Sequence, residues 1–67
     1  MLENRVREVR LRHKLSQTKL SRLVEVPESQ LSAVERGRLW PWPKLRRNLA
    51  KVLGVPEDEL FPEIIEE

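Results

Sequence analysis

The sequence predicts an all-α fold, a compact bundle of about five short helices in one domain. Apolar residues recur at intervals of three and four positions instead of alternating, which is the period of a helix. Residues that start or stop helices divide the 67-residue chain into short segments. The two glycines and five prolines nowhere separate two alternating segments, so no β-hairpin is predicted.

The first two helices are expected before and after residue 15. The first runs to about residue 13. Leu2, Val6 and Val9 lie on one face of this helix, and His13 lies at the polar edge of that face. Ser16 is a suitable N-cap for the second helix. The apolar side of that helix comprises Leu20, Leu23 and Val24.

Three further helices follow. Pro27 fits the first turn of a helix over residues 27–36, which buries Leu31 and Val34 and stops at Gly37. Pro43 opens a fourth helix that ends at Gly54, with an apolar face of Leu45, Leu49, Val52 and Leu53. A very short fifth helix begins at Pro56, carries acids in its first turn and ends at Pro62.

Composition excludes several classes of function. The chain has no cysteine and one histidine, so we expect no disulfide, metal site or cofactor. Apolar runs never exceed two residues, so we expect no membrane span or signal peptide and a cytoplasmic location. The serines lack a plausible base and no glycine-rich phosphate loop is present, so neither an enzyme nor a small-molecule ligand is predicted.

Charge is distributed unevenly along the chain. Residues 1–54 hold all 13 basic residues against five acids, a net charge of +8, whereas residues 55–67 hold six acids and no base. A basic body indicates a polyanionic partner, although ordinary surface charge is the alternative. We therefore predict a domain over residues 1–62 and an acidic tail over residues 63–67.

The second and third helices are the feature that points to a function. With Leu31 and Val34 turned inward, the outward face of helix 27–36 presents Ser29, Ser32, Ala33 and Arg36. The major groove of DNA is about 12 Å wide and admits a helix whose leading side chains are compact. This face is therefore suited to the major groove.

The segment LSQTKLSRLVEVPESQLSAVERGR resembles the helix-turn-helix of phage repressor and Cro-like regulators, the xenobiotic-response-element family. The resemblance continues through PWPKLRRNLAKVLGVPEDELFP and covers roughly residues 4–62. It implies base-reading positions at Glu28, Ser29, Ser32 and Ala33. It implies phosphate contacts from Lys14, Ser16, Gln17, Arg36, Arg38 and Lys44. It also implies a partly buried structural ion pair between Arg10 and Glu35.

Four positions depart from the family pattern. Glu25 and Lys14 stand where glycine is usual, and a left-handed backbone at Glu25 would cost on the order of 1 kcal/mol. Ser21 replaces a usual alanine, and its hydroxyl can bond back within its own helix. Glu28 replaces a frequent glutamine; it either accepts a hydrogen bond from cytosine N4 or only stabilises its own helix terminus.

The resulting prediction is a sequence-specific regulator of transcription, a repressor, that binds double-stranded DNA. Because one such module reads few base pairs, we expect a homodimer on a palindromic operator. The alternatives are a protein-interaction module of the same fold, an antitoxin or anti-repressor, and a domain excised from a longer chain. Burial in the core is favoured over DNA stacking for Trp40 and Trp42, and a solvated surface is favoured over phosphate contact for Arg46, Arg47 and Lys51. Ile64 and Ile65 either fold back onto the domain or join a dimer contact.

Overall fold

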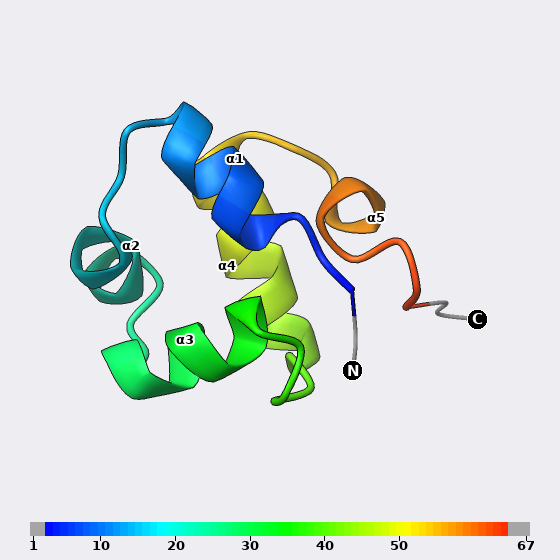
Figure 1. The fold of residues 1–67 in the computed structure, drawn as a ribbon. Helices are drawn as coiled ribbons and strands as arrows, with labels where there is room; N and C mark the ends of the chain where they lie inside the picture. Colours follow the sequence, from blue (N-terminus) through cyan, green and yellow to red (C-terminus); the bar gives the residue numbers. More distant parts are fainter. Residues whose placement is uncertain (1–2, 65–67) are drawn as a thin grey trace.

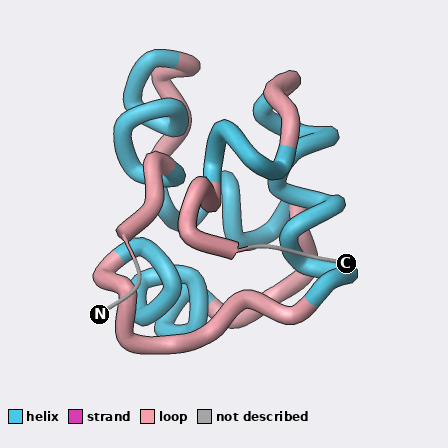
Figure 2. Tube along the Cα trace, turned by 90° about the vertical axis from the view of Figure 1, so that its right-hand side faces the viewer, coloured by secondary structure: helices cyan, strands magenta, loops and turns pink. Residues whose placement is uncertain are grey.

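The computed structural model describes residues 3–64 of the chain. This part contains five helices joined by loops (Figure 1). They are α1 (Val6–Arg12), α2 (Gln17–Leu23), α3 (Glu28–Glu35), α4 (Pro43–Leu53) and α5 (Glu57–Leu60). No strand occurs between residues 3 and 64, as the tube drawing also shows (Figure 2). The all-α prediction is confirmed.

The core lies where α1, α3 and α4 meet, with α2 on one side and α5 on the other (Figure 1). Its buried apolar residues come from all five helices and from the C-cap residues of α2 and α5: Val6, Val9, Leu20, Val24, Leu31, Val34, Leu45, Leu49, Leu53, Leu60 and Phe61. The expected apolar faces supply most of this list. Leu2, which was expected on the face of the first helix, lies outside the described residues.

Four helices end in the same backbone conformation. The residue after the C-cap has a positive φ in three of them, 57° at Lys14, 59° at Glu25 and 74° at Gly37, and in α4 the C-cap Gly54 itself has a φ of 69°. After α1, the N–H groups of Lys14 and Leu15 donate to the carbonyls of Leu11 and Arg10 at 3.0 and 3.1 Å. This is the Schellman pattern, which satisfies two of the carbonyl groups that a helix end leaves open. We refer to these four endings as the helix stops.

Side chains satisfy the beginnings of two helices. Ser16 is the N-cap of α2, and its Oγ accepts a hydrogen bond from Lys19 N at 3.0 Å. Before α1, Asn4 Oδ1 accepts from Val6 N at 3.1 Å, and Asn4 Nδ2 donates to the carbonyl of Val34 at 2.9 Å. Asn4 therefore ties the first segment of the described chain to the end of α3.

Some expected details were wrong. Helix α3 is one residue shorter at each end than the predicted 27–36, with Pro27 and Arg36 as its caps. Leu23 was expected on the inner side of α2 but is 48% exposed, because α2 ends there and its apolar face is already filled by Leu20 and Val24. The expected stop of the fifth helix is confirmed, because α5 ends at Leu60 with Phe61 as its C-cap, directly before Pro62.

Candidate nucleic-acid interface

The α2–α3 pair is held together by small and apolar side chains. Leu31 and Val34 of α3 are fully buried in the same core as Leu20 of α2. Ser21 lies on the buried side of α2, and its Oγ donates to the carbonyl of Thr18 at 2.7 Å. Because this hydroxyl is satisfied within its own helix, it can be buried without an unpaired polar atom.

The face of α3 turned away from the core carries the residues that the sequence marked for base reading. Glu28 and Ser29, in the first turn, are exposed. Ser32 and Ala33, one turn later, are half-buried. Arg36 follows at the exposed cap of the helix. The face is thus polar, compact at its centre and cationic at its end.

Arg10 and Glu35 form a nearly enclosed ion pair between α1 and α3. Arg10 Nε and Nη2 donate to the two carboxylate oxygens of Glu35 at 2.9 and 3.1 Å, and the side chains are 9% and 3% exposed. Arg10 Nη1 also donates to the carbonyl of Leu15 at 2.9 Å. Two parallel N–H···O bonds of this kind fix orientation as well as distance. The pair therefore holds α3 at a defined angle to α1.

A polar hollow of about 430 Å³ lies beside this pair, where α1, α2 and α3 meet. Its walls comprise Arg7, Arg10, Gln17, Ser32, Glu35 and Arg36. The Gln17 amide turns into the hollow, with its Nε2 3.5 Å from Glu35 Oε1. Three arginines against one carboxylate make the hollow cationic, which suits an anionic group. Arg7 is the member that the sequence reasoning missed.

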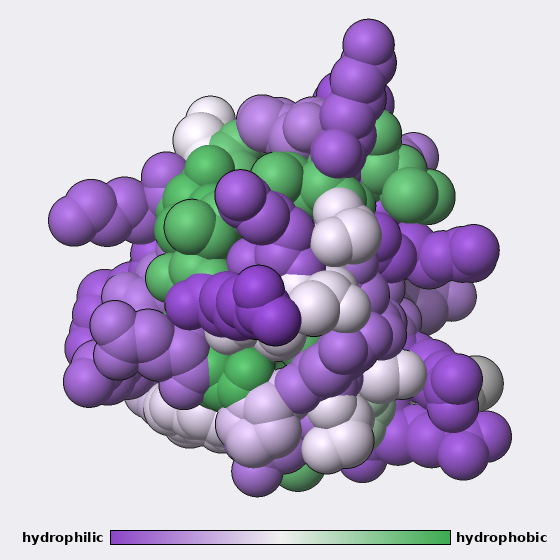
Figure 3. Space-filling model, turned by 90° about the vertical axis from the view of Figure 1, so that its left-hand side faces the viewer, coloured by the Kyte–Doolittle hydropathy of each residue, from purple (hydrophilic) through white to green (hydrophobic). Residues whose placement is uncertain are grey.

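The other residues expected to contact phosphates do not line this hollow. All four are exposed: Lys14 and Arg38 follow α1 and α3, Ser16 is the N-cap of α2, and Lys44 lies in the first turn of α4. Ser16 Oγ already accepts one hydrogen bond, and its hydroxyl can still donate another. Hydrophilic side chains dominate most of the face on which α2 lies, with apolar surface in the upper part of the view (Figure 3). The structure thus presents an exposed polar surface around the α2–α3 pair.

Glu28 makes a contact that the sequence did not indicate. Thr18 Oγ1, in the first turn of α2, donates to Glu28 Oε2 at 2.9 Å. The N-cap of α3 is Pro27, whose side chain makes no capping hydrogen bond. The Glu28 carboxylate thus accepts a hydrogen bond from α2, and this bond links the first turns of the two helices.

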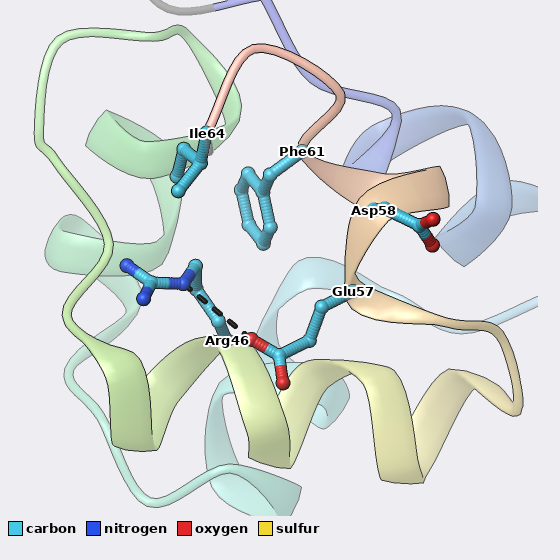
Figure 4. A pocket seen from close by; sticks show the side chains of 5 residues that line it. All are labelled: Arg46, Glu57, Asp58, Phe61 and Ile64. Atoms are coloured by element: carbon cyan, nitrogen blue, oxygen red, sulfur yellow. Dashed lines mark ion pairs between the residues drawn. The ribbon is translucent and has the colours of Figure 1, made fainter. Parts of the chain in front are cut away.

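A second hollow, of about 320 Å³, lies between α4, α5 and the segment after α5 (Figure 4). It is lined by Arg46, Glu57, Asp58, Phe61 and Ile64. Ile64 also packs against the core, whereas Ile65 lies outside the described residues. The Asp58 carboxylate points away from Arg46 in this view, and the Glu57 carboxylate points toward it.

Arg46 is buried and does not belong to the solvated surface. It is 4% exposed, its Nη1 donates to the carbonyl of Pro41 at 2.7 Å, and its Nε lies 3.5 Å from Glu57 Oε1. The preference for a solvated side chain was therefore wrong. Arg46 joins the loop before α4 to α5, so its role is structural.

The two tryptophans lie outside the core. Trp40 is 59% exposed and Trp42 is 37% exposed, so the preference for burial was wrong. Two prolines bracket Trp42, and Pro41 takes the buried position in this loop. The loop between α3 and α4 thus presents aromatic surface next to the end of α3.

The described part of the chain, residues 3–64, holds neither a membrane-spanning helix nor a cluster of metal ligands. No helix there is long and apolar enough to cross a membrane. No group of three or more acidic or histidine side chains there is placed to hold a metal ion.

Comparison with known proteins gives a family and a solved structure. A family model described as helix-turn-helix matches residues 6–60. The chain is similar to the restriction-modification controller protein C.AhdI from Aeromonas hydrophila, with a TM-score of 0.79 and 35% sequence identity over 85% of this chain and 86% of that one. No curated protein gives a match.

Proposed function

Because the chain belongs to the helix-turn-helix family, we propose that it is a transcription regulator that binds double-stranded DNA through α3. The observation that carries the proposal is the outward face of α3, polar and compact, flanked by a cationic hollow and exposed basic residues. A helix of this kind fits the major groove, where base edges are read. The likeness to a restriction-modification controller supports the same class of function.

The proposed roles divide the surface into base reading and phosphate contact. Base reading falls to Glu28, Ser29, Ser32 and Ala33. Phosphate contact falls to Lys14, Ser16, Gln17, Arg36, Arg38 and Lys44, to which we add Arg7 because it lines the same hollow as Gln17 and Arg36. Arg10 and Glu35 hold the frame and do not read bases.

Glu28 sets a preference for one base. A carboxylate only accepts hydrogen bonds, and cytosine N4 is a donor in the major groove with no acceptor of the same base beside it. Adenine N6 is also a donor, but the neighbouring N7 acceptor repels a carboxylate. We therefore propose cytosine at the position that Glu28 faces.

One module of this size reads only a few base pairs, which is too few for selectivity in a genome. We propose a homodimer on a palindromic operator whose half-sites lie about one helical turn, 10 base pairs, apart. Repression follows when such an operator overlaps the site of a polymerase. We assign the binding to the domain over residues 1–62 and assign no DNA contact to the acidic residues of segment 63–67.

Selection from a pool of random duplexes, followed by titration of salt, tests the proposal. The expected result is an enriched palindrome with cytosine in each half-site. If about five phosphates are contacted per subunit, the logarithm of the binding constant should fall with the logarithm of salt at a slope of roughly −4 to −5 per subunit. A binding constant that does not change with salt concentration, or no binding to any duplex, would contradict the proposed function.

A second function is favoured by the exposed Trp40 and Trp42, since tryptophan is enriched in protein interfaces. It is a protein-interaction module of the same fold, an antitoxin or anti-repressor. This alternative predicts a stable protein complex together with weak, unselective binding to duplex DNA. The same selection separates the two functions, because an interaction module enriches no sequence.

A further inference from the structure

The Thr18–Glu28 contact bears on specificity. Thr18 lies in the first turn of α2, Glu28 is the first residue of α3, and both residues are exposed. We propose that Thr18 is a positioning residue that fixes the Glu28 carboxylate for base reading and thereby sets the strength of the cytosine preference. This inference rests on the proposed function and assigns a role to a residue that would itself read no base.

The chemistry of the hydrogen bond has a defined direction. A carboxylate is acceptor-only, so the Thr18 hydroxyl is the donor in the 2.9 Å contact with Oε2. The bond occupies one oxygen of Glu28 and leaves Oε1 able to accept from another donor. A base amino group that approaches α3 therefore meets a carboxylate with one oxygen held and the other available.

The two side chains differ in stiffness. Glutamate has three rotatable bonds and loses much conformational freedom when it is fixed. Threonine is branched at Cβ and is restricted at χ1 in a helix. A stiff donor on α2 thus holds a flexible acceptor on α3 before DNA arrives. Such preorganisation lowers the conformational entropy that Glu28 loses on binding. The gain applies only to a base whose donor meets the carboxylate in the orientation that Thr18 holds.

Loss of the Thr18 hydroxyl should leave phosphate contacts unchanged. The cationic hollow is lined by other residues, so the electrostatic attraction does not pass through Thr18. Without its donor, Glu28 can turn toward water and make its contact with cytosine less often. The expected result is a weaker base preference with an unchanged dependence on salt.

The test measures binding of the full chain to duplexes that carry each base in turn at the selected position. Wild type should favour cytosine about fivefold to tenfold, the low end of the discrimination given by a good bidentate contact. Thr18→Val, which keeps the shape and removes the donor, should reduce this to about twofold at the same salt slope. Thr18→Ser keeps the donor and should retain the preference. Glu28→Ala should abolish it, and adding Thr18→Val should then change nothing.

Two outcomes would overturn the inference alone. One is an undiminished cytosine preference in a Thr18→Val chain whose circular dichroism is that of wild type. The other is an equal loss of affinity for all four bases, which would mark Thr18 as merely structural. Failure of the wild type to bind any duplex would overturn the proposed function as well.

Discussion

The Arg10–Glu35 pair supports a quantitative prediction for Glu35→Ala. The substitution removes both oxygens that accept from the Arg10 guanidinium, in a site where the side chains are 9% and 3% exposed. Removing one partner of a buried pair costs about 3–5 kcal/mol, because the remaining charge is left uncompensated. Arg10 keeps its bond to the carbonyl of Leu15, so we expect the lower part of that range, about 3–4 kcal/mol.

Such a loss is large for a domain of this size. A chain of 67 residues has a free energy of unfolding of about 3–10 kcal/mol. Each kcal/mol corresponds to about 4–8 °C in Tm for a small domain, so Glu35→Ala should lower Tm by about 12–30 °C. Thermal and urea unfolding followed by circular dichroism at 222 nm measure both quantities.

Two further variants give the experiment its controls. Arg12→Ala breaks the exposed Arg12–Glu8 pair, whose side chains are 66% and 60% exposed, and should cost at most about 0.5 kcal/mol. Replacing both Arg10 by Met and Glu35 by Leu strands no charge and should recover most of the lost stability. A Tm for Glu35→Ala within about 3 °C of wild type would refute the reasoning.

Three other predictions follow from the structure. Glu25→Gly should raise the free energy of unfolding by about 0.5–1 kcal/mol in urea titrations, because its φ of 59° suits glycine better; Lys14→Gly should repeat the gain, and Glu25→Ala should show none. Arg46→Met should cost about 1–3 kcal/mol in the same assay and leave the salt slope of DNA binding unchanged, so a smaller slope would assign Arg46 to a phosphate. Arg7→Ala should reduce the magnitude of the salt slope of DNA binding by about 0.9, because one phosphate contact is lost. Arg12→Ala changes the charge equally and should leave the slope unchanged. Equal slopes in the two variants would show that Arg7 does not contact DNA.

Local patterns predicted most of the fold. The helices follow from the spacing of apolar residues and from short-range signals such as the Ser16 cap and the stop at Gly54, which act within a few residues. The apolar spacing and these signals depend on neighbours in sequence, and sequence reasoning reaches them. Glu25 and Lys14 were singled out on another ground, the glycine usual at these positions in the family that the chain resembles, and both have positive φ.

Tertiary contacts account for what was missed. Arg46 shares the spacing of Leu49 and Leu53 on the buried side of α4, a signal that was available but is normally set aside for a charged residue. The Thr18–Glu28 bond had no such signal, because it depends on how the first turns of α2 and α3 approach each other.

The helix stops have a consequence for how the chain reaches its folded state. Each stop joins backbone groups at most six residues apart, so the endings of four helices add only local contacts to the fold. Helical domains with mainly local contacts fold in microseconds to milliseconds. We therefore expect the free chain to be fully folded before it meets DNA. Association is then docking between preformed surfaces, and its heat-capacity change should match the interface area alone.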